Sequence, residues 1–255
     1  MTLPPFFTCG FLSYVRDHTV RDVQVYWYHP DFSQSRYPPG QQVSEACTLI
    51  CLLVAQRICE SKLQLENVET SPQLTAMIGA SIVEGNDTHA WILRRGLVPH
   101  PYLNTDEALT FGGKRLKSIV EWQFQVFREN IETSLCTNIQ RFLHDWYQKP
   151  RGETLIMLLI TCGRTVLLLF QSRANKITLF DSHGHSTVRN PHRGLVVAQA
   201  KFERLYDLCD WYIQDVLHNC FNVYADQYEL AFLYYVDAGC CKSEESPCDC
   251  GCNNC

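Results

Sequence analysis

The stretch Lys176-Ile-Thr-Leu-Phe-Asp181-Ser-His183-Gly-His185-Ser186 joins a strand pattern to a short polar segment. Alternate residues of a strand point to the same side of a sheet, so Asp181 and His183 are expected on the face of Ile177. That face begins apolar and ends in a carboxylate and an imidazole. A carboxylate beside an imidazole fixes its tautomer and stabilises its protonated form. The segment therefore predicts a buried strand that carries acid–base groups at its C-terminal end.

Further strands are expected on both sides of this one. The run Leu155-Ile-Met-Leu-Leu-Ile160, the turn at Cys162-Gly163 and the run Val166-Leu-Leu-Leu-Phe170 are typical of a hairpin buried on both faces. The strand-forming runs at residues 23–28, 194–198 and 228–236 predict three more strands.

Helices are expected mainly before the hairpin. Residues 46–58 are apolar nearly all round, which is typical of a helix inside the protein, and Ser44 is its predicted N-cap. Apolar spacing predicts further helices at 72–83, 88–94, 131–147 and 202–217. The order predicts an α+β fold, with N-terminal helices packed on a mostly antiparallel central sheet, in one domain over residues 1–238.

Composition narrows the class of protein. The 255 residues include 22 Lys and Arg against 27 Asp and Glu, for a formal net charge of −5, which argues against a nucleic-acid partner. No apolar run reaches the length of a membrane span. The N-terminal residues do not resemble a signal peptide, so a cytoplasmic location is expected, with a nuclear or membrane-associated one as alternatives.

Cys47 stands at the start of the apolar helix, shortly after Gln41 and Gln42. A helix N-terminus stabilises a thiolate over a thiol. A glutamine side chain and the backbone N–H of the cysteine can together bind an oxyanion. With Asp181 and His183 later in the chain, the sequence follows the cysteine-then-histidine order of papain-like enzymes.

Residues 176–217 resemble the deubiquitinase domain of the herpesvirus large tegument protein, in which a strand ends in Asp-Pro-His and a further strand and a helix follow. The glutamine six positions before Cys47 is similar to the arrangement in MINDY-type deubiquitinases. The resemblance extends in order over most of the domain. Ser182 departs from the proline of that family, as do the residues next to Cys47.

The resemblance implies a papain-like cysteine protease fold and a deubiquitinase that cleaves isopeptide or peptide bonds of ubiquitin or ubiquitinated proteins. Cys47 would be the nucleophile, His183 the general base, Asp181 the orienting carboxylate and Gln41 the oxyanion donor, with no cofactor for catalysis. Gln42 competes with Gln41, and His185 with His183. The alternative is an inactive relative that binds ubiquitin or another protein.

Six of the 14 cysteines lie in the last 16 residues. Residues 239–255 are predicted to be a separate cysteine-rich tail. Thiolates at Cys248, Cys250, Cys252 and Cys255 suit a soft metal, Zn or Cu. Acylation that tethers the chain to a membrane, or a tail without fixed structure, are the alternatives. Apart from Cys47, the cysteines before the tail are expected to be buried structural thiols.

Overall fold

The computed structural model describes residues 14–17, 20, 22–41 and 43–237. Within them, eight strands form one sheet in which every neighbouring pair is antiparallel, in the order β1-β2-β7-β6-β5-β4-β8-β3. The strands are β1 (Tyr14–Asp17), β2 (Gln24–Tyr28), β3 (Ile119–Phe127), β4 (Thr154–Thr161), β5 (Arg164–Gln171), β6 (Lys176–Asp181), β7 (Val196–Ala200) and β8 (Tyr228–Tyr235).

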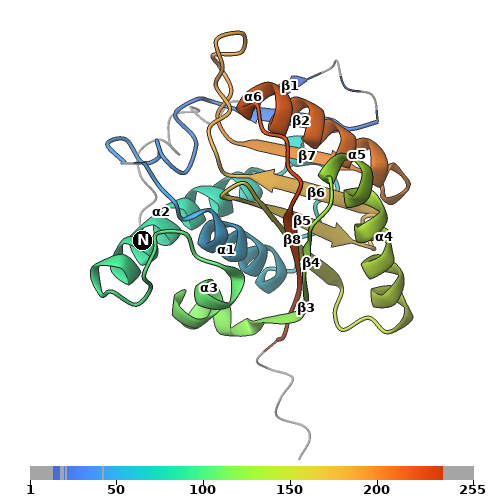
Figure 1. The fold of residues 1–255 in the computed structure, drawn as a ribbon, viewed down its shortest axis with the longest axis horizontal. Helices are drawn as coiled ribbons and strands as arrows, with labels where there is room; N and C mark the ends of the chain where they lie inside the picture. The colour runs from blue at the N-terminus through green and yellow to red at the C-terminus, as the bar shows by residue number, and fades with distance from the viewer. Residues whose placement is uncertain (1–13, 18–19, 21, 42, 238–255) are drawn as a thin grey trace, which may run out of the picture.

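Helices cover both faces of the sheet (Figure 1). The helices are α1 (Cys47–Glu60), α2 (Pro72–Arg94), α3 (Thr105–Phe111), α4 (Ile131–Gln148), α5 (Leu205–Trp211) and α6 (Asn219–Phe221), with 3-10 turns at Val68–Thr70, Lys114–Ser118 and Phe202–Arg204 and a π-helical segment at Tyr212–His218. None of the helices among these residues combines the length and the apolar character that crossing a membrane requires.

Two apolar cores lie on opposite faces of the sheet. On β4, Ile156 and Leu158 pack with α1, α2 and α3, whereas Leu155 and Met157 pack with α4, α5 and the π-helical segment. Both faces of the central strands are therefore buried, which explains their unbroken apolar runs. The predicted α+β class, with N-terminal helices on a mostly antiparallel sheet, is confirmed.

Helix α1 lies between the sheet and α2, and all its residues from Cys47 to Gln56 are buried. The two helices approach closely because α2 has Gly85 at the contact. A Cβ atom at that position would lie 2.6 Å from Ile50 Cγ1. The close contact fixes the position of α1, and with it the position of Cys47.

Two predictions about these helices are wrong. Ser44 is not the N-cap of α1, because Ala46 holds that position; Ser44 Oγ instead donates to Asn86 Oδ1 at 2.5 Å. Residues 72–94 form one helix and not two, although Gly85 and Asn86 suggest a break. Gly85 makes room for α1, and the Asn86 amide donates to the carbonyl of Gln34 at 2.9 Å.

The other predicted elements are present, with one difference in the last long helix. The pattern at residues 202–217 predicts one regular helix, but the structure divides it into a 3-10 turn, α5 and the π-helical segment. Strand β3 was not predicted. It lies at the sheet edge, its apolar residues alternate with Glu121, Gln123 and Gln125, and a bulge interrupts that alternation.

Candidate active site

Cys47 is the first residue of α1 and its side chain is only 4% exposed. The backbone N–H groups of the first helical turn have no partners within the helix, and they point toward the side where Cys47 lies. This end of a helix favours a negative charge. Its place in α1 therefore prepares Cys47 to exist as a thiolate.

Strand β6 ends at Asp181, whose side chain is fully buried. The turn that follows directs the backbone N–H and the Nδ1 atom of His183 onto Asp181 Oδ1, at 3.0 and 2.6 Å. Since a carboxylate accepts, His183 Nδ1 carries the proton in this contact and Nε2 is left to act on another group. The His183 side chain is 11% exposed.

Cys47 and His183 lie close enough for each to shift the pKa of the other. Burial raises the pKa of the Cys47 thiol, but the nearby His183 and Thr165 together leave it below its ordinary value of 9.0. Burial lowers the pKa of His183, but Asp181 and Cys47 raise it from 6.5 to about 9. These opposite shifts favour a thiolate–imidazolium pair at neutral pH.

Burial also raises the pKa of Asp181, but the imidazoles of His183 and His185 outweigh it and hold the pKa well below its usual value. Asp181 is therefore ionised in the folded protein. Its Oδ2 atom lies 3.0 Å from His185 Nε2, so one carboxylate contacts two histidines. His185 is 1% exposed, and the cleft is lined by His183 but not by His185.

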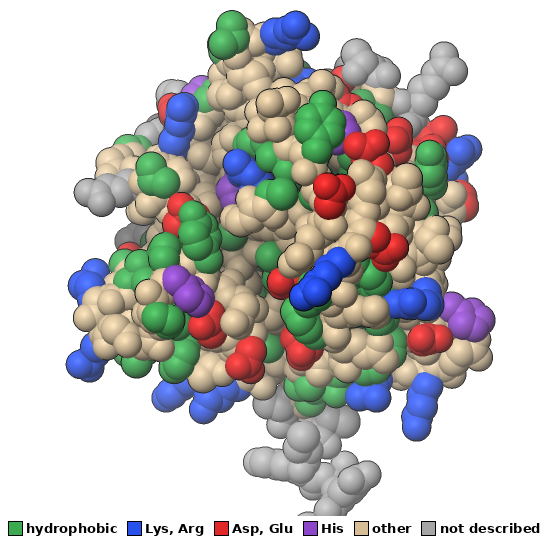
Figure 2. All heavy atoms as spheres, viewed as in Figure 1, with side chains coloured by type: hydrophobic (Ala, Val, Ile, Leu, Met, Phe, Trp, Pro, Cys, Tyr) green, Lys and Arg blue, Asp and Glu red, His purple; other side chains and the backbone are tan. Residues whose placement is uncertain are grey.

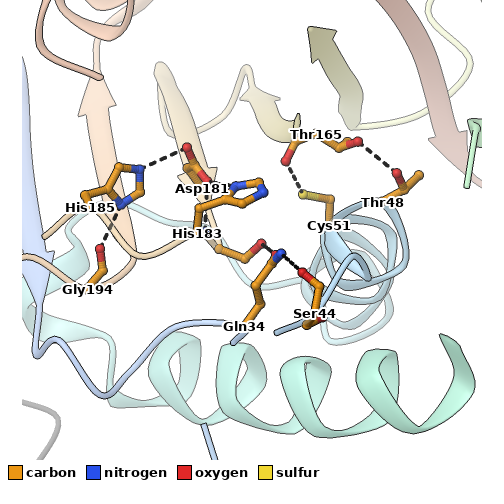
Figure 3. A network of polar contacts seen from close by, with 10 residues as sticks. Gln34, Ser44, Thr48, Cys51, Thr165, Asp181, His183, His185 and Gly194 are labelled. Atoms are coloured by element: carbon orange, nitrogen blue, oxygen red, sulfur yellow. Dashed lines mark hydrogen bonds and ion pairs between the residues drawn. The ribbon is translucent and has the colours of Figure 1, made fainter. Parts of the chain in front are cut away.

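Gln34 connects the histidine-bearing turn to the chain before α1 (Figure 3). Its Nε2 atom donates to the carbonyl of Ser44 at 2.7 Å, and its Oε1 atom accepts from Ser182 Oγ at 2.6 Å. The backbone N–H of Gln34 also donates to the carbonyl of Ser182 at 2.8 Å. Ser182, which departs from the proline expected by resemblance, thus has a structural role that proline could not fill.

The structure brings together Cys47, His183 and Asp181 of the predicted site residues. Gln41 lies on the segment before α1, where its backbone N–H donates to Pro38, and it is not among the residues that line the cleft. Gln42 lies outside the described residues. Gln34, which does line the cleft, was missed by sequence reasoning, because no local pattern in the sequence marks it as a site residue.

A cleft of about 430 Å³ opens beside this group. His183 and Gly184 line one part of it, and Ser44 and Glu45, just before Cys47, line another. Arg164 also lines the cleft and lies over the ring of Phe221 at 3.5 Å. Across the molecular face in Figure 2, acidic and basic side chains are interspersed. The cleft therefore lies along His183 and the residues just before Cys47.

The remaining cysteines of the described residues match the expectation of buried thiols only in part. Cys51 and Cys209 are buried, but Cys162 is exposed, and Cys59, Cys136 and Cys220 are half-buried, so the expectation of buried thiols is wrong for Cys162. No group of three or more His, Cys, Asp or Glu side chains within the described ranges is arranged to hold a metal ion. The predicted ligands Cys248, Cys250, Cys252 and Cys255 lie outside those ranges.

Comparison with known proteins gives fold similarity without close relatives. No protein-family model matches the chain, and no curated protein matches it. It is similar to the ubiquitin-specific protease encoded by murine cytomegalovirus tegument protein M48, solved in complex with a ubiquitin-based suicide substrate. The identity is 14%, the match covers 86% of this chain and 89% of that chain, and the TM-score is 0.48.

A second similar structure is the Pseudomonas avirulence protein AvrPphB, with 14% identity over 75% of this chain and 95% of that chain and a TM-score of 0.38. The chemistry open to this chain follows from its own Cys47, His183 and Asp181.

Proposed function

We propose that the chain is a cysteine peptidase of the deubiquitinase type. The close grouping of Cys47 and His183, with Asp181 hydrogen-bonded to His183 and a cleft lined by His183, is the observation that carries the proposal. The inactive alternative would be favoured by a cysteine out of reach of any histidine. Ubiquitin is proposed as the substrate from the resemblance of residues 176–217.

In the proposed reaction, the Cys47 thiolate attacks the carbonyl carbon of the scissile bond and the carbonyl oxygen becomes an oxyanion. His183 then donates its proton to the leaving amine as the C–N bond breaks, which leaves a thioester on Cys47. A water molecule attacks this thioester and gives a proton to His183. The carboxylic acid product leaves, and the thiolate and imidazolium are restored. Asp181 keeps the imidazole oriented throughout.

The oxyanion needs donors besides the backbone N–H of Cys47. Gln41 is the donor proposed from the sequence. Gln34 is a second candidate, favoured because it is 2% exposed, lines the cleft and is held on both sides by hydrogen bonds. One of its two amide hydrogens is used by Ser44, and the described residues give the other no acceptor.

A ubiquitin probe with a C-terminal vinyl electrophile tests the proposal. Wild-type protein should form a covalent adduct one ubiquitin heavier, and Cys47→Ala should form none. Cys51→Ala is the matched control, since Cys51 is a buried thiol one helical turn further along α1 and should not affect labelling.

Two other results would reject parts of the proposal. Labelling that persists in Cys47→Ala would exclude Cys47 as the nucleophile. An unlabelled wild type whose Cys47 still reacts rapidly with iodoacetamide at neutral pH would reject ubiquitin as the substrate while keeping the activated thiol.

A further inference from the structure

His185 is held at both of its ring nitrogens. Its Nε2 atom lies 3.0 Å from Asp181 Oδ2, and its Nδ1 atom lies 2.7 Å from the carbonyl oxygen of Gly194. Its backbone N–H donates to the carbonyls of Arg193 and Gly194. The residue therefore connects the catalytic carboxylate to the point where the loop between β6 and β7 returns to the sheet.

Both partners of the His185 ring are acceptors. A carbonyl oxygen can only accept, and Asp181 is ionised, so its oxygens can only accept as well. A ring with a single N–H would direct a lone pair at one of these oxygens. Both hydrogen bonds form only when each ring nitrogen carries a hydrogen.

The surroundings hold the ring in this orientation. Trp27 contacts it with ring centroids 5.3 Å apart, and Phe221 contacts it at 5.2 Å. The charged groups nearby are Asp181 at the ring itself and Arg193, which lies over Trp27 at 4.2 Å and pairs with Asp17 at 3.4 Å. His185 and Asp181 thus form a buried pair enclosed by aromatic rings.

The far side of the His185 ring is equally constrained. Gly194 accepts from His185 and donates its own N–H to the carbonyl of Tyr28 at 2.8 Å. A Cβ atom at position 194 would lie 2.0 Å from the carbonyl oxygen of His29, so only glycine fits. The acceptor for His185 Nδ1 is fixed by backbone packing.

We propose that His185 is a positioning residue that donates from both ring nitrogens and holds Asp181 so that Oδ1 faces His183. Without it, Oδ2 has no donor among the described residues and the carboxylate can rotate away from His183. His183 would then lose its fixed tautomer and its orientation toward Cys47. The catalytic consequence rests on the proposed function, but the donor state of His185 does not.

The donor state is tested on the wild-type protein by NMR of ¹⁵N-labelled histidine, with His185→Gln used to assign the signal. Both ring nitrogens of His185 should show a bonded hydrogen in the folded protein. A signal from a ring nitrogen without hydrogen would overturn the proposal. This measurement needs no substrate, so its outcome is independent of whether ubiquitin is cleaved.

The positioning role is tested with His185→Phe, which keeps a ring but no donor, and His185→Gln, which keeps one N–H for Asp181. His185→Phe should lower kcat by up to about 100-fold with KM little changed, because misplacement of a catalytic group by about 1 Å has an effect of this size. His185→Gln should retain more activity. His192→Gln, an exposed histidine of the same loop, should match the wild type.

Iodoacetamide alkylation of Cys47 gives a second readout. The pH at which the alkylation rate reaches half its maximum should be higher in His185→Phe, because His183 no longer stabilises the thiolate fully. His185→Gln should raise this pH by less. If folded His185→Phe keeps wild-type kcat and alkylation midpoint, the positioning role is wrong. If the wild type cleaves no ubiquitin, the proposed function fails while the NMR and alkylation results still test His185.

Discussion

Asp181 contacts two imidazoles with one buried carboxylate, and this arrangement sets the acid–base behaviour of the candidate site. The pKa of His183 is about 9 because the favourable interactions with Asp181 and Cys47 exceed the effect of burial. An imidazolium that persists through neutral pH can donate a proton to a leaving amine. The pKa of His183 therefore predicts how activity depends on pH.

Activity should fall as pH rises through about 9, because His183 then loses the proton that it donates. Asp181→Asn removes the charge that raises the pKa of His183, so the same fall should begin at lower pH, and kcat should decrease at all pH values. The measurement is kcat against pH for both proteins.

Asp31→Asn is the matched control, since Asp31 and His29 form an exposed pair 3.6 Å apart. Its pH profile should match that of the wild type. An Asp181→Asn profile with an unchanged alkaline limb would show that Asp181 does not set the pKa of His183.

Gln34 is predicted to contribute to both stability and activity. Gln34→Ala leaves Ser182 Oγ and the Ser44 carbonyl without their partner, which should lower the free energy of unfolding by about 1–3 kcal/mol. If Gln34 binds the oxyanion, kcat should also fall by about 10²–10³-fold.

Urea unfolding and steady-state kinetics of Gln34→Ala and Gln41→Ala separate the two candidates. The variant of the true oxyanion donor loses kcat by far more than any change in its folded fraction. A loss of that size in Gln41→Ala alone would show that Gln41, and not Gln34, is the oxyanion donor.

At the scale of elements, the contact between α1 and α2 determines where Cys47 lies. Gly85 allows α2 to approach Ile50 of α1 more closely than a residue with a Cβ atom would. Alanine is intrinsically favoured over glycine in a helix by about 1 kcal/mol. A Cβ atom 2.6 Å from Ile50 Cγ1 should cost more than this gain, since overpacking typically costs about 1–3 kcal/mol.

Gly85→Ala should therefore destabilise the protein, as measured by its urea midpoint, and should slow the alkylation of Cys47 because α1 shifts. Ile50→Ala in the same chain should relieve part of the clash, because it removes the Cγ1 atom that the new Cβ would meet. Gly152→Ala serves as the control, since its Cβ atom would come no closer than 3.8 Å to a neighbour. A stabilised Gly85→Ala variant would show that the helices separate without strain.

The elements also show why some predictions succeeded. The hairpin of β4 and β5 was predictable because both strands are buried on both faces and need apolar residues throughout. Strand β3 was not, because its exposure changes along the strand and a bulge near Trp122 interrupts its alternation. Helix α2 contains Gly85 and Asn86, which in the sequence suggest the end of a helix. In the structure both residues lie within the helix, because contacts with other parts of the chain require them there.

At the scale of the whole molecule, β8 lies between β4 and β3 and ends at Tyr235, close to the predicted boundary between domain and tail. A chain ending at Asp237 keeps every strand of the sheet. We expect it to unfold at the same urea concentration as the full chain and to react with the ubiquitin probe equally well. A large loss of stability would show that the tail belongs to the domain.

The same pair of proteins tests the predicted chemistry of the tail. Native mass spectrometry of the full chain should show added Zn or Cu that is absent from the shorter chain, if the terminal cysteines bind metal. Added acyl mass would instead support membrane tethering. A full chain with neither addition would reject both predictions.

The sequence by itself determined the α+β class, the central strands, the position of α1 and the candidate groups Cys47, Asp181 and His183. These depend on local patterns: apolar runs, helix spacing and the two-residue period of a strand. Which groups meet was decided by tertiary structure, since Gln34, Ser182 and Asn86 join three segments far apart in the chain. The choice between His183 and His185 was likewise decided by packing, because Gly194 and Trp27 hold His185 behind Asp181 and leave His183 at the cleft.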